Sequence, residues 1–242
     1  MKIAMAMSLV ALLLAPLASH ADALSEDRVK ELVLEAIREN PEIVLEAVQI
    51  IERREQERQA AAAASVLSEN RDLLENDPNA PVLGNPEGDV TVVEFFDYNC
   101  PYCRRVKPHI EALLDEDPNV RLVYREWPIL GDGSVFAARA ALAAREQGKY
   151  EEFHWALMGM QGRAEEASVI QVAQEIGLDI AQLRRDMQAP EIDAHIAASM
   201  EMSRALGFNG TPSFVIGDAL VPGVIEADQM IRLAQEARAA GQ

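Results

Sequence analysis

Cysteine is almost absent from this sequence, which has only Cys100 and Cys103 among its 242 residues. A disulfide-stapled scaffold needs more cysteines, and a chain of this length buries a sufficient core without staples. A structural zinc site would need two further ligands. The histidines after residue 23 are His109, His154 and His195, and none of them has paired ligand spacing. We therefore expect no structural metal and no cofactor.

Positive charge is also scarce, with 22 Lys and Arg against 40 Asp and Glu and a formal net charge of −18. This balance argues against nucleic acid and against anionic membrane surfaces as partners. Beyond residue 23, no segment of the sequence is long and apolar enough to span a bilayer. We therefore expect a soluble mature protein that does not bind nucleic acid.

The first 23 residues have the pattern of a secretory signal peptide. Lys2 is followed by the apolar run Ile3–Leu17, and Ala21-Asp22-Ala23 supplies an A-x-A cleavage pattern. The run is shorter than the roughly 20 residues that a membrane-spanning helix needs, which disfavours an anchor. We predict cleavage after Ala21 or Ala23 and export to an oxidising compartment, where a disulfide can persist.

Residues 24–76 are predicted to form an N-terminal helical segment. Ser25 is a favourable N-cap, and a second helix is expected from Pro41 onwards. The stretch Glu52–Ala64 is charged and then alanine-rich, which is typical of a solvated helical connector. The segment either packs back on its own domain or self-associates, and we favour self-association because the connector isolates its apolar stripe. The stripe comprises Val29, Leu32, Val33, Ile37, Ile43, Val44, Val48 and Ile51.

From about Pro81 the pattern becomes that of an α/β domain. The apolar run Asp89–Phe96 predicts a strand buried on both faces, a helix follows through about Asp115, and Asn119–Trp127 alternates as a second strand. Strand, helix and strand in this order are typical of a parallel sheet. After them we expect helices over 135–147, 150–158, 167–176, 180–187 and 192–206, a hairpin over 213–216 and 219–221, and a last helix over 227–239.

The two cysteines follow the first of these strands directly. Pro101 is at a favoured first helical position, which puts Cys100 at or near the N-cap. The helix dipole and free N–H groups there favour an anion and lower the pKa of a thiol. Cys103, one turn later, is placed to attack a mixed disulfide and release the substrate. We predict a redox pair in which Cys100 is the exposed nucleophile and Cys103 the buried resolving thiol.

Glu94 is a third candidate catalytic residue. It lies six residues before Cys100 and inside the apolar strand. If it is buried behind the pair, its pKa is raised and it can accept the proton of Cys103 as that thiol attacks. The alternative is that Glu94 points outward at a strand edge. Its apolar neighbours favour burial.

These motifs, with the helical block of residues 134–206, resemble those of the DsbA family of thioredoxin-fold proteins. The resemblance covers residues 81–242 and implies a thioredoxin domain with a DsbA-like helical insertion, here preceded by an N-terminal helical segment. The residues that carry it are Glu94-Phe95-Phe96, Cys100-Pro101-Tyr102-Cys103, Pro108 and Gly210-Thr211-Pro212.

The resemblance implies a periplasmic thiol-disulfide oxidoreductase, either oxidase or isomerase. It implies a cis Thr211-Pro212 bond facing the cysteines, with Thr211, Pro212, Pro101 and Tyr102 contacting a substrate strand. Tyr102 stands where the strongest oxidants of the family have histidine, so weaker oxidising power is expected. The implied partners are unfolded or misfolded secreted proteins with cysteines and a membrane redox partner.

The N-terminal helices also resemble the oligomerisation stalk of ScsC-type proteins, a copper-tolerance branch of this family. This resemblance implies a homo-oligomer, with a trimer favoured, that can isomerise disulfides. An alternative function is copper binding, since Cys and Met suit Cu(I) and two methionine pairs occur, Met158 with Met160 and Met200 with Met202. We favour packing as the role of these methionines. A third alternative is a structural adhesin in which the cysteines form an inert clip.

Overall fold

The computed structural model describes residues 25–241, so the predicted signal peptide lies outside the described residues. The chain divides into two compact units, one ending at Glu55 and one beginning at Gln56. No helix within the described range is long and apolar enough to cross a membrane.

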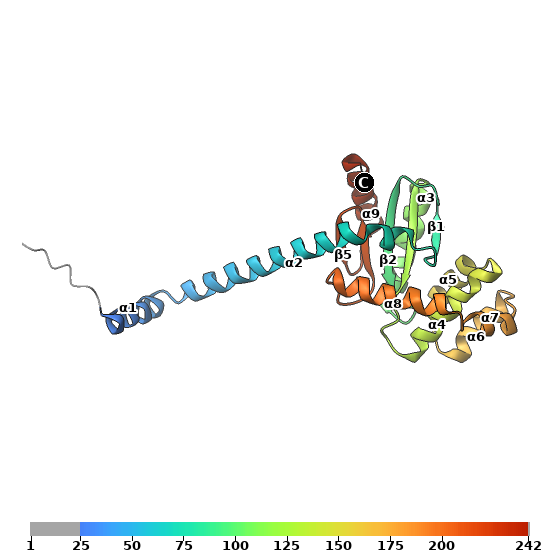
Figure 1. Ribbon diagram of the computed structural model, residues 1–242, viewed down its shortest axis with the longest axis horizontal. Coiled ribbons are helices and arrows are strands. Elements are labelled where there is room, and N and C mark those ends of the chain that lie inside the picture. The colour runs from blue at the N-terminus through green and yellow to red at the C-terminus, as the bar shows by residue number, and fades with distance from the viewer. Residues whose placement is uncertain (1–24, 242) are drawn as a thin grey trace, which may run out of the picture. The chain divides into compact units, whose positions relative to one another are not determined.

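The first unit consists of helix α1 (Glu26–Glu39) and the first half of helix α2 (Glu42–Asn76) (Figure 1). Ser25 caps α1 as expected, because its side chain accepts a hydrogen bond of 3.3 Å from the backbone N–H of Arg28. No residue of α1 is buried. The apolar side chains of this unit are therefore exposed to solvent: Val29, Leu32, Val33, Leu34, Ile43, Val44, Leu45, Val48, Ile50 and Ile51.

The second half of α2 belongs to the second unit. The predicted connector Glu52–Ala64 is helical and continuous with the rest of α2. From Ala63 onwards the helix has a buried face, on which Leu67 and Leu74 pack against one side of the sheet. A catalytic domain that begins only after α2 would therefore lack part of its core.

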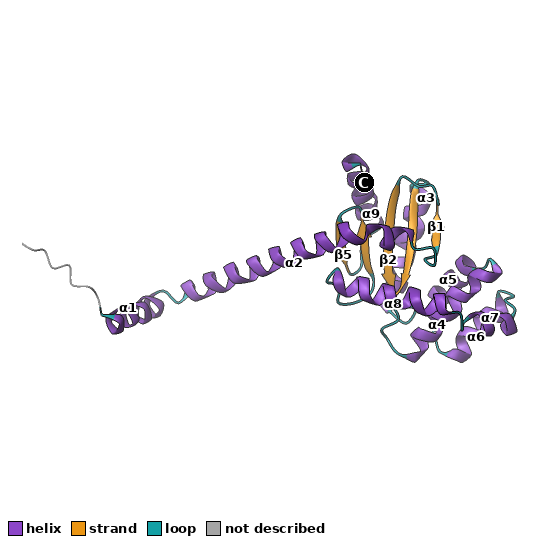
Figure 2. Ribbon diagram, in the orientation of Figure 1, coloured by secondary structure: helices purple, strands orange, loops and turns teal. Residues whose placement is uncertain are grey.

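The sheet of the second unit has five strands in the order β1-β3-β2-β4-β5 (Figure 2). Strands β2 and β3 are parallel, as the β-α-β pattern predicts, and the other pairs are antiparallel. The short strand β1 was not expected from the sequence, since three residues carry too little periodicity. The strands are β1 (Val82–Gly84), β2 (Val90–Phe96), β3 (Val120–Glu126), β4 (Ser213–Ile216) and β5 (Ala219–Pro222).

Each face of the sheet is covered by helices. Helices α3 (Pro101–Glu116) and α9 (Ala227–Ala240) contribute to the core cluster that also contains Val92 and both cysteines. The end of α2 and the C-terminal part of α8 contribute to the cluster on the other face, which contains Val93. Residues alternate between the two clusters along β2, because successive side chains of a strand point to opposite faces.

The helical insertion follows β3 and contains no strand between residues 132 and 205. This confirms the predicted thioredoxin fold with a DsbA-like insertion. The predicted helices occur with small shifts of their ends: α4 (Asp132–Ala143), the 3-10 helix η1 (Ala144–Gln147), α5 (Tyr150–Gly159), α6 (Glu166–Glu175), α7 (Ile180–Asp186) and α8 (Pro190–Ala205).

Strand β3 differs from its predicted alternation of apolar and polar faces. Arg125 is 0% and Glu126 1% exposed, so the polar end of this strand is buried. A buried charge is tolerated only where it is paired and hydrogen-bonded. Glu126 is hydrogen-bonded to Tyr150 and His195, and Arg125 pairs with Asp77 through Nη1, whereas Nε and Nη2 of Arg125 have no hydrogen-bond partner among the described residues.

Candidate active site

The cysteine pair lies at the start of α3, as the sequence predicts. Cys100 is the N-cap residue, with φ −79° and ψ 117°, and Pro101 occupies the first helical turn. The backbone N–H of Cys100 donates to the carbonyl oxygen of Asp97 at 3.0 Å. Cys103 is buried one turn further along the helix. Both cysteines are free thiols in the structure.

Cys100 is less exposed than predicted. The residue is only 4% exposed, and its Sγ lies 3.1 Å from the carbonyl oxygen of Thr211. A hydrogen bond from the Cys103 thiol lowers the pKa of Cys100 to about 6, against the opposing effect of burial, and contacts with Thr211 and the backbone N–H groups of Tyr102 and Cys103 lower it further. Roughly nine-tenths of a thiol with this pKa is ionised at pH 7. The prediction that Cys100 is exposed is therefore wrong, but the surroundings of Cys100 favour its thiolate form.

Glu94 lies behind the pair on β2 and is 1% exposed, so the predicted burial is confirmed and the outward-facing alternative is wrong. Neither carboxyl oxygen has a hydrogen-bond partner among residues 25–241. Burial, and then the negative charge of a Cys100 thiolate, raise the pKa of Glu94. Burial, the hydrogen bond to Cys100 and the charge of Glu94 likewise raise the pKa of Cys103. The site therefore combines one activated thiol, one thiol kept protonated and one neutral buried acid.

The Thr211–Pro212 peptide bond is cis, as the resemblance implies. Its Thr211 carbonyl faces the Cys100 thiol, so this loop and the start of α3 come together from positions more than a hundred residues apart in the chain. A groove of about 340 Å³ continues from the loop towards the edge strand β5. Its lining includes Phe208, Thr211, Pro212, Leu220 and Pro222.

Pro101 and Tyr102, the two residues between the cysteines, are exposed. The Tyr102 side chain is 52% exposed, and the guanidinium carbon of Arg105 lies 5.2 Å from the centre of its ring. A phenol in this position adds no positive charge beside Cys100.

Two polar residues of the turn before Cys100 were missed by the sequence analysis. The carboxylate of Asp97 accepts backbone N–H groups of Asn99 (2.7 Å), Ile129 (2.8 Å) and Leu130 (2.9 Å). The side chain of Asn99 bonds both the N–H (2.8 Å) and the carbonyl (3.0 Å) of Ala164. These contacts fix the active-site turn to the loop after β3 and to the insertion. The Asp-x-Asn sequence at the end of a predicted strand was the signal that could have indicated this hydrogen-bonded turn.

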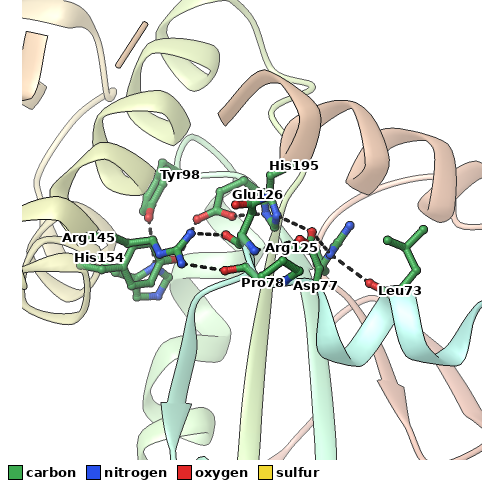
Figure 3. Close-up of polar contacts among 11 residues, drawn as sticks. Leu73, Asp77, Pro78, Tyr98, Arg125, Glu126, Arg145, His154 and His195 are labelled. Atoms are coloured by element: carbon green, nitrogen blue, oxygen red, sulfur yellow. Dashed lines mark hydrogen bonds and ion pairs between the residues drawn. The ribbon is translucent and has the colours of Figure 1, made fainter. Parts of the chain in front are cut away.

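A buried polar network lies behind this turn (Figure 3). His195 on α8 bonds Asp77 through Nδ1 (3.0 Å) and Glu126 through Nε2 (2.8 Å). Asp77, which follows α2, also pairs with Arg125 at 2.7 Å, and the Tyr150 hydroxyl donates to Glu126 at 2.7 Å. Burial disfavours the His195 cation, but the hydrogen bonds to both carboxylates raise the pKa of His195 above 6.5. The network joins α2, β3, α5 and α8.

The active-site turn meets this region through Tyr98. Its hydroxyl lies 3.1 Å from Nδ1 of His154, and both residues are 1% exposed (Figure 3). Burial, and then the positive charge of Lys107, lower the pKa of His154 to about 3, so its ring is neutral. A neutral imidazole can accept a hydrogen bond from the Tyr98 hydroxyl. His154 therefore takes part in a packed polar core.

The methionine pairs of the copper alternative lie in different parts of the core. Met158 is 4% exposed in the cluster that contains the cysteines, and Met202 is 5% exposed in the cluster on the other face of the sheet. Within residues 25–241, no group of three or more His, Cys, Asp or Glu side chains is arranged to hold a metal ion. The arrangement favours packing over copper binding.

Comparison with known proteins agrees with this geometry. Residues 91–235 match the family described as a DSBA-like thioredoxin domain. A thioredoxin-like oxidoreductase from Silicibacter pomeroyi DSS-3 is 70% identical, with a TM-score of 0.70 over 70% of this chain and 98% of that one. BcfH of Salmonella enterica Typhimurium is 27% identical, with a TM-score of 0.73 over 88% and 95% of the two chains.

A Proteus mirabilis ScsC variant with a linker deletion is 28% identical, with a TM-score of 0.69 over 92% of this chain and 99% of that one. Among curated proteins, the Na(+)/H(+) antiporter NhaA 1 of Salinispora arenicola is 33% identical over 137 residues, which are 56% of this chain and 21% of the antiporter. The chain thus spans about a fifth of the length of that relative. Family match, fold and site together place the chain in the DsbA family, with a fold similar to that of ScsC.

Proposed function

We propose that Cys100 and Cys103 form the redox centre of a periplasmic enzyme that exchanges disulfides with cysteines of exported proteins. The observation that carries this proposal is the opposite displacement of two neighbouring pKa values, lowered to about 6 at Cys100 and raised at Cys103. An inert clip needs neither an activated thiolate nor a buried acid behind it. Such perturbed groups are typical of catalytic sites.

Oxidation of a substrate begins with the disulfide form of the pair. A substrate thiolate attacks Sγ of Cys100, the bond to Cys103 breaks, and Cys103 leaves as a thiolate that receives a proton from neutral Glu94. A second substrate thiolate then attacks the mixed disulfide, and Cys100 leaves as the stabilised thiolate. The substrate loses two electrons to the pair. A membrane redox partner carrying its own disulfide takes these electrons and restores the Cys100–Cys103 bond.

The reverse direction uses the same atoms. The Cys100 thiolate attacks a wrong disulfide, and this removes the negative charge that helps to hold the proton on Glu94. Glu94 then releases its proton to solvent, and as a carboxylate it accepts the proton of Cys103 while that thiol attacks the mixed disulfide. An extended substrate segment pairs with the backbone at Thr211 and lies in the adjacent groove, which is β-strand addition. Backbone pairing requires no particular side chain, so unfolded and misfolded proteins are the expected substrates.

We further propose that the part of residues 24–76 that lies in the first unit, up to Glu55, acts as an oligomerisation segment, and that the rest of α2 completes the core of the thioredoxin domain of residues 81–242. The support is the exposed apolar surface of the first unit: Val33 and Ile51 of the stripe are 51% and 64% exposed, and Leu45, outside the stripe, is 65% exposed. An apolar surface of this extent is typical of an interface. A trimer is favoured by similarity to ScsC, and several Cys100 thiolates in one particle would act at high effective concentration on a misfolded chain.

Incubation of the oxidised protein with a reduced, unfolded thiol protein tests the proposal. We expect one substrate disulfide to form for each Cys100–Cys103 bond that is lost. When the substrate protein instead carries a disulfide, the Cys103→Ser variant should accumulate a mixed disulfide with it, because the Cys100 thiolate attacks that bond and no resolving thiol follows. The matched Cys100→Ser variant should not accumulate one. Substrate oxidation that survives Cys100→Ser would refute the assignment.

A further inference from the structure

The rim of the active site carries positive charge, although the protein as a whole has a net charge of −18. Three arginines surround the start of α3: Arg104 and Arg105 follow Cys103 directly, and Arg163 comes from the loop between α5 and α6. We call these three residues the arginine rim. Lys107 is not part of it, because its ammonium group lies over the ring of Trp155 on α5, 5.2 Å from the ring centre.

Arg104 is fixed next to the reactive sulfur by neutral acceptors. Its Nε donates to the carbonyl of Tyr98 (3.1 Å), and its Nη1 donates to the carbonyls of Met160 (3.2 Å) and Gly162 (2.7 Å). Its Nη2 has no partner among the described residues. Burial and the nearby charge of Arg163 lower the pKa of Arg104, and the charges of Asp97 and then of a Cys100 thiolate oppose this effect. Arg104 is therefore close to Cys100, and its charge is partly offset by Asp97.

Arg105 and Arg163 present the accessible part of the rim. Arg105 is exposed, covers Tyr102 and forms no ion pair within residues 25–241. The Arg163 side chain is 59% exposed, donates to the carbonyl of Leu130 at 3.0 Å and pairs with Glu165 at 3.1 Å. Two carboxylates act on these arginines: Glu165, whose side chain is 57% exposed, and Asp97, which is buried beneath three backbone N–H groups.

The geometry points to a specificity device, and we propose that the arginine rim selects substrate segments with Asp or Glu close to the reactive cysteine. This inference rests on the proposed exchange reaction at Cys100 and names its substrate class. The overall negative charge does not oppose such selection at short range. Charges more than about 8 Å apart are largely screened at physiological ionic strength. The charged groups nearest Cys100 therefore determine which substrate segment is preferred.

Paired peptides test this inference. The two peptides of a pair share a single cysteine, which is flanked by acidic residues in one peptide and by lysines in the other. The rate at which each peptide opens the Cys100–Cys103 disulfide is measured at physiological ionic strength. Each rate is divided by that of the same peptide with a small uncharged disulfide, because flanking charge also changes the pKa of the peptide thiol. Two exposed ion pairs predict a preference of about three- to tenfold for the acidic peptide.

Two variants locate the effect. In Arg105→Gln/Arg163→Gln the preference should fall to about one, while the rate with an uncharged peptide stays unchanged. In the matched control Arg184→Gln, which removes an arginine paired with Glu166 on α6, the preference should persist. Equal rates in the parent protein, faster reaction of the lysine peptide, or a preference that survives in the double variant would overturn the inference. If no peptide opens the disulfide, the exchange reaction itself is refuted.

Discussion

Removal of the Cys103 thiol should make Cys100 a weaker acid, and the size of the change can be worked out from the site. The hydrogen bond from Cys103 is the largest cause that lowers the pKa of Cys100 from 9.0 to about 6. A hydrogen bond to a charged group contributes about 1.5–3 kcal/mol, and one pKa unit corresponds to about 1.4 kcal/mol. The Cys103→Ala variant should therefore titrate about one to two units higher, at a pKa of about 7–8.

A serine at the same position separates the hydrogen bond from the cavity. The hydroxyl of Cys103→Ser still donates to the Cys100 thiolate, so the pKa should stay near 6 in this variant. Thiolate absorbance measured across pH 4–10 follows Cys100 alone in both variants, because each has a single cysteine. Identical titrations of the Ser and Ala variants, or a midpoint near that of an ordinary thiol in both, would refute the reasoning.

Three further predictions concern residues around the pair. Glu94→Gln should slow release of the mixed disulfide, because glutamine cannot accept the Cys103 proton. The release rate is measured by quenched-flow from pH 5 to 8, and rates equal to those of the parent would show that Glu94 has no role in the mechanism. His195 has a raised folded-state pKa, so its stabilisation is complete below about pH 6.5 and is lost as pH rises through the folded-state value. Urea unfolding of the parent and His195→Gln should differ by about 3–5 kcal/mol at pH 5.5 and by less at pH 9.5, whereas a difference that grows with pH would contradict the sign. Deletion of residues 24–55 spares the buried face of α2 from Ala63 onwards. Light scattering should show that this variant is a monomer, and the variant should oxidise dithiols but no longer isomerise scrambled substrates. A monomeric parent protein would refute the oligomer proposal.

Much of the active site could be predicted because its signals are local. Pro101 after an apolar strand predicts that a helix starts at Cys100. The apolar neighbours of Glu94 within that strand predict that its side chain is buried. Both depend on residues within one turn or one strand of each other. The same reasoning gave the helical insertion, since each of its helices has its own apolar period and its own breaks.

The parts that were missed depend on distant partners. Cys100 is covered by Thr211, and a prediction of its exposure needs the position of a loop 111 residues away. His195 and Asp77 are 118 residues apart, so neither residue alone indicates a buried ion pair. Arg125 and Glu126 continue a regular alternation along β3, and only the end of α2 and helix α8 make that polar end an interior. Packing between elements, and not the periodicity within one, decides these positions.

The reduction potential of the Cys100–Cys103 pair tests the central claim most directly. It is measured by equilibration with glutathione buffers and quantification of the free thiols. Stabilisation of the Cys100 thiolate favours the reduced form, so the account predicts a reversible two-electron couple more oxidising than about −270 mV, the value for thioredoxin. A pair that fails to equilibrate, or a potential below about −300 mV as in structural disulfides, would contradict it.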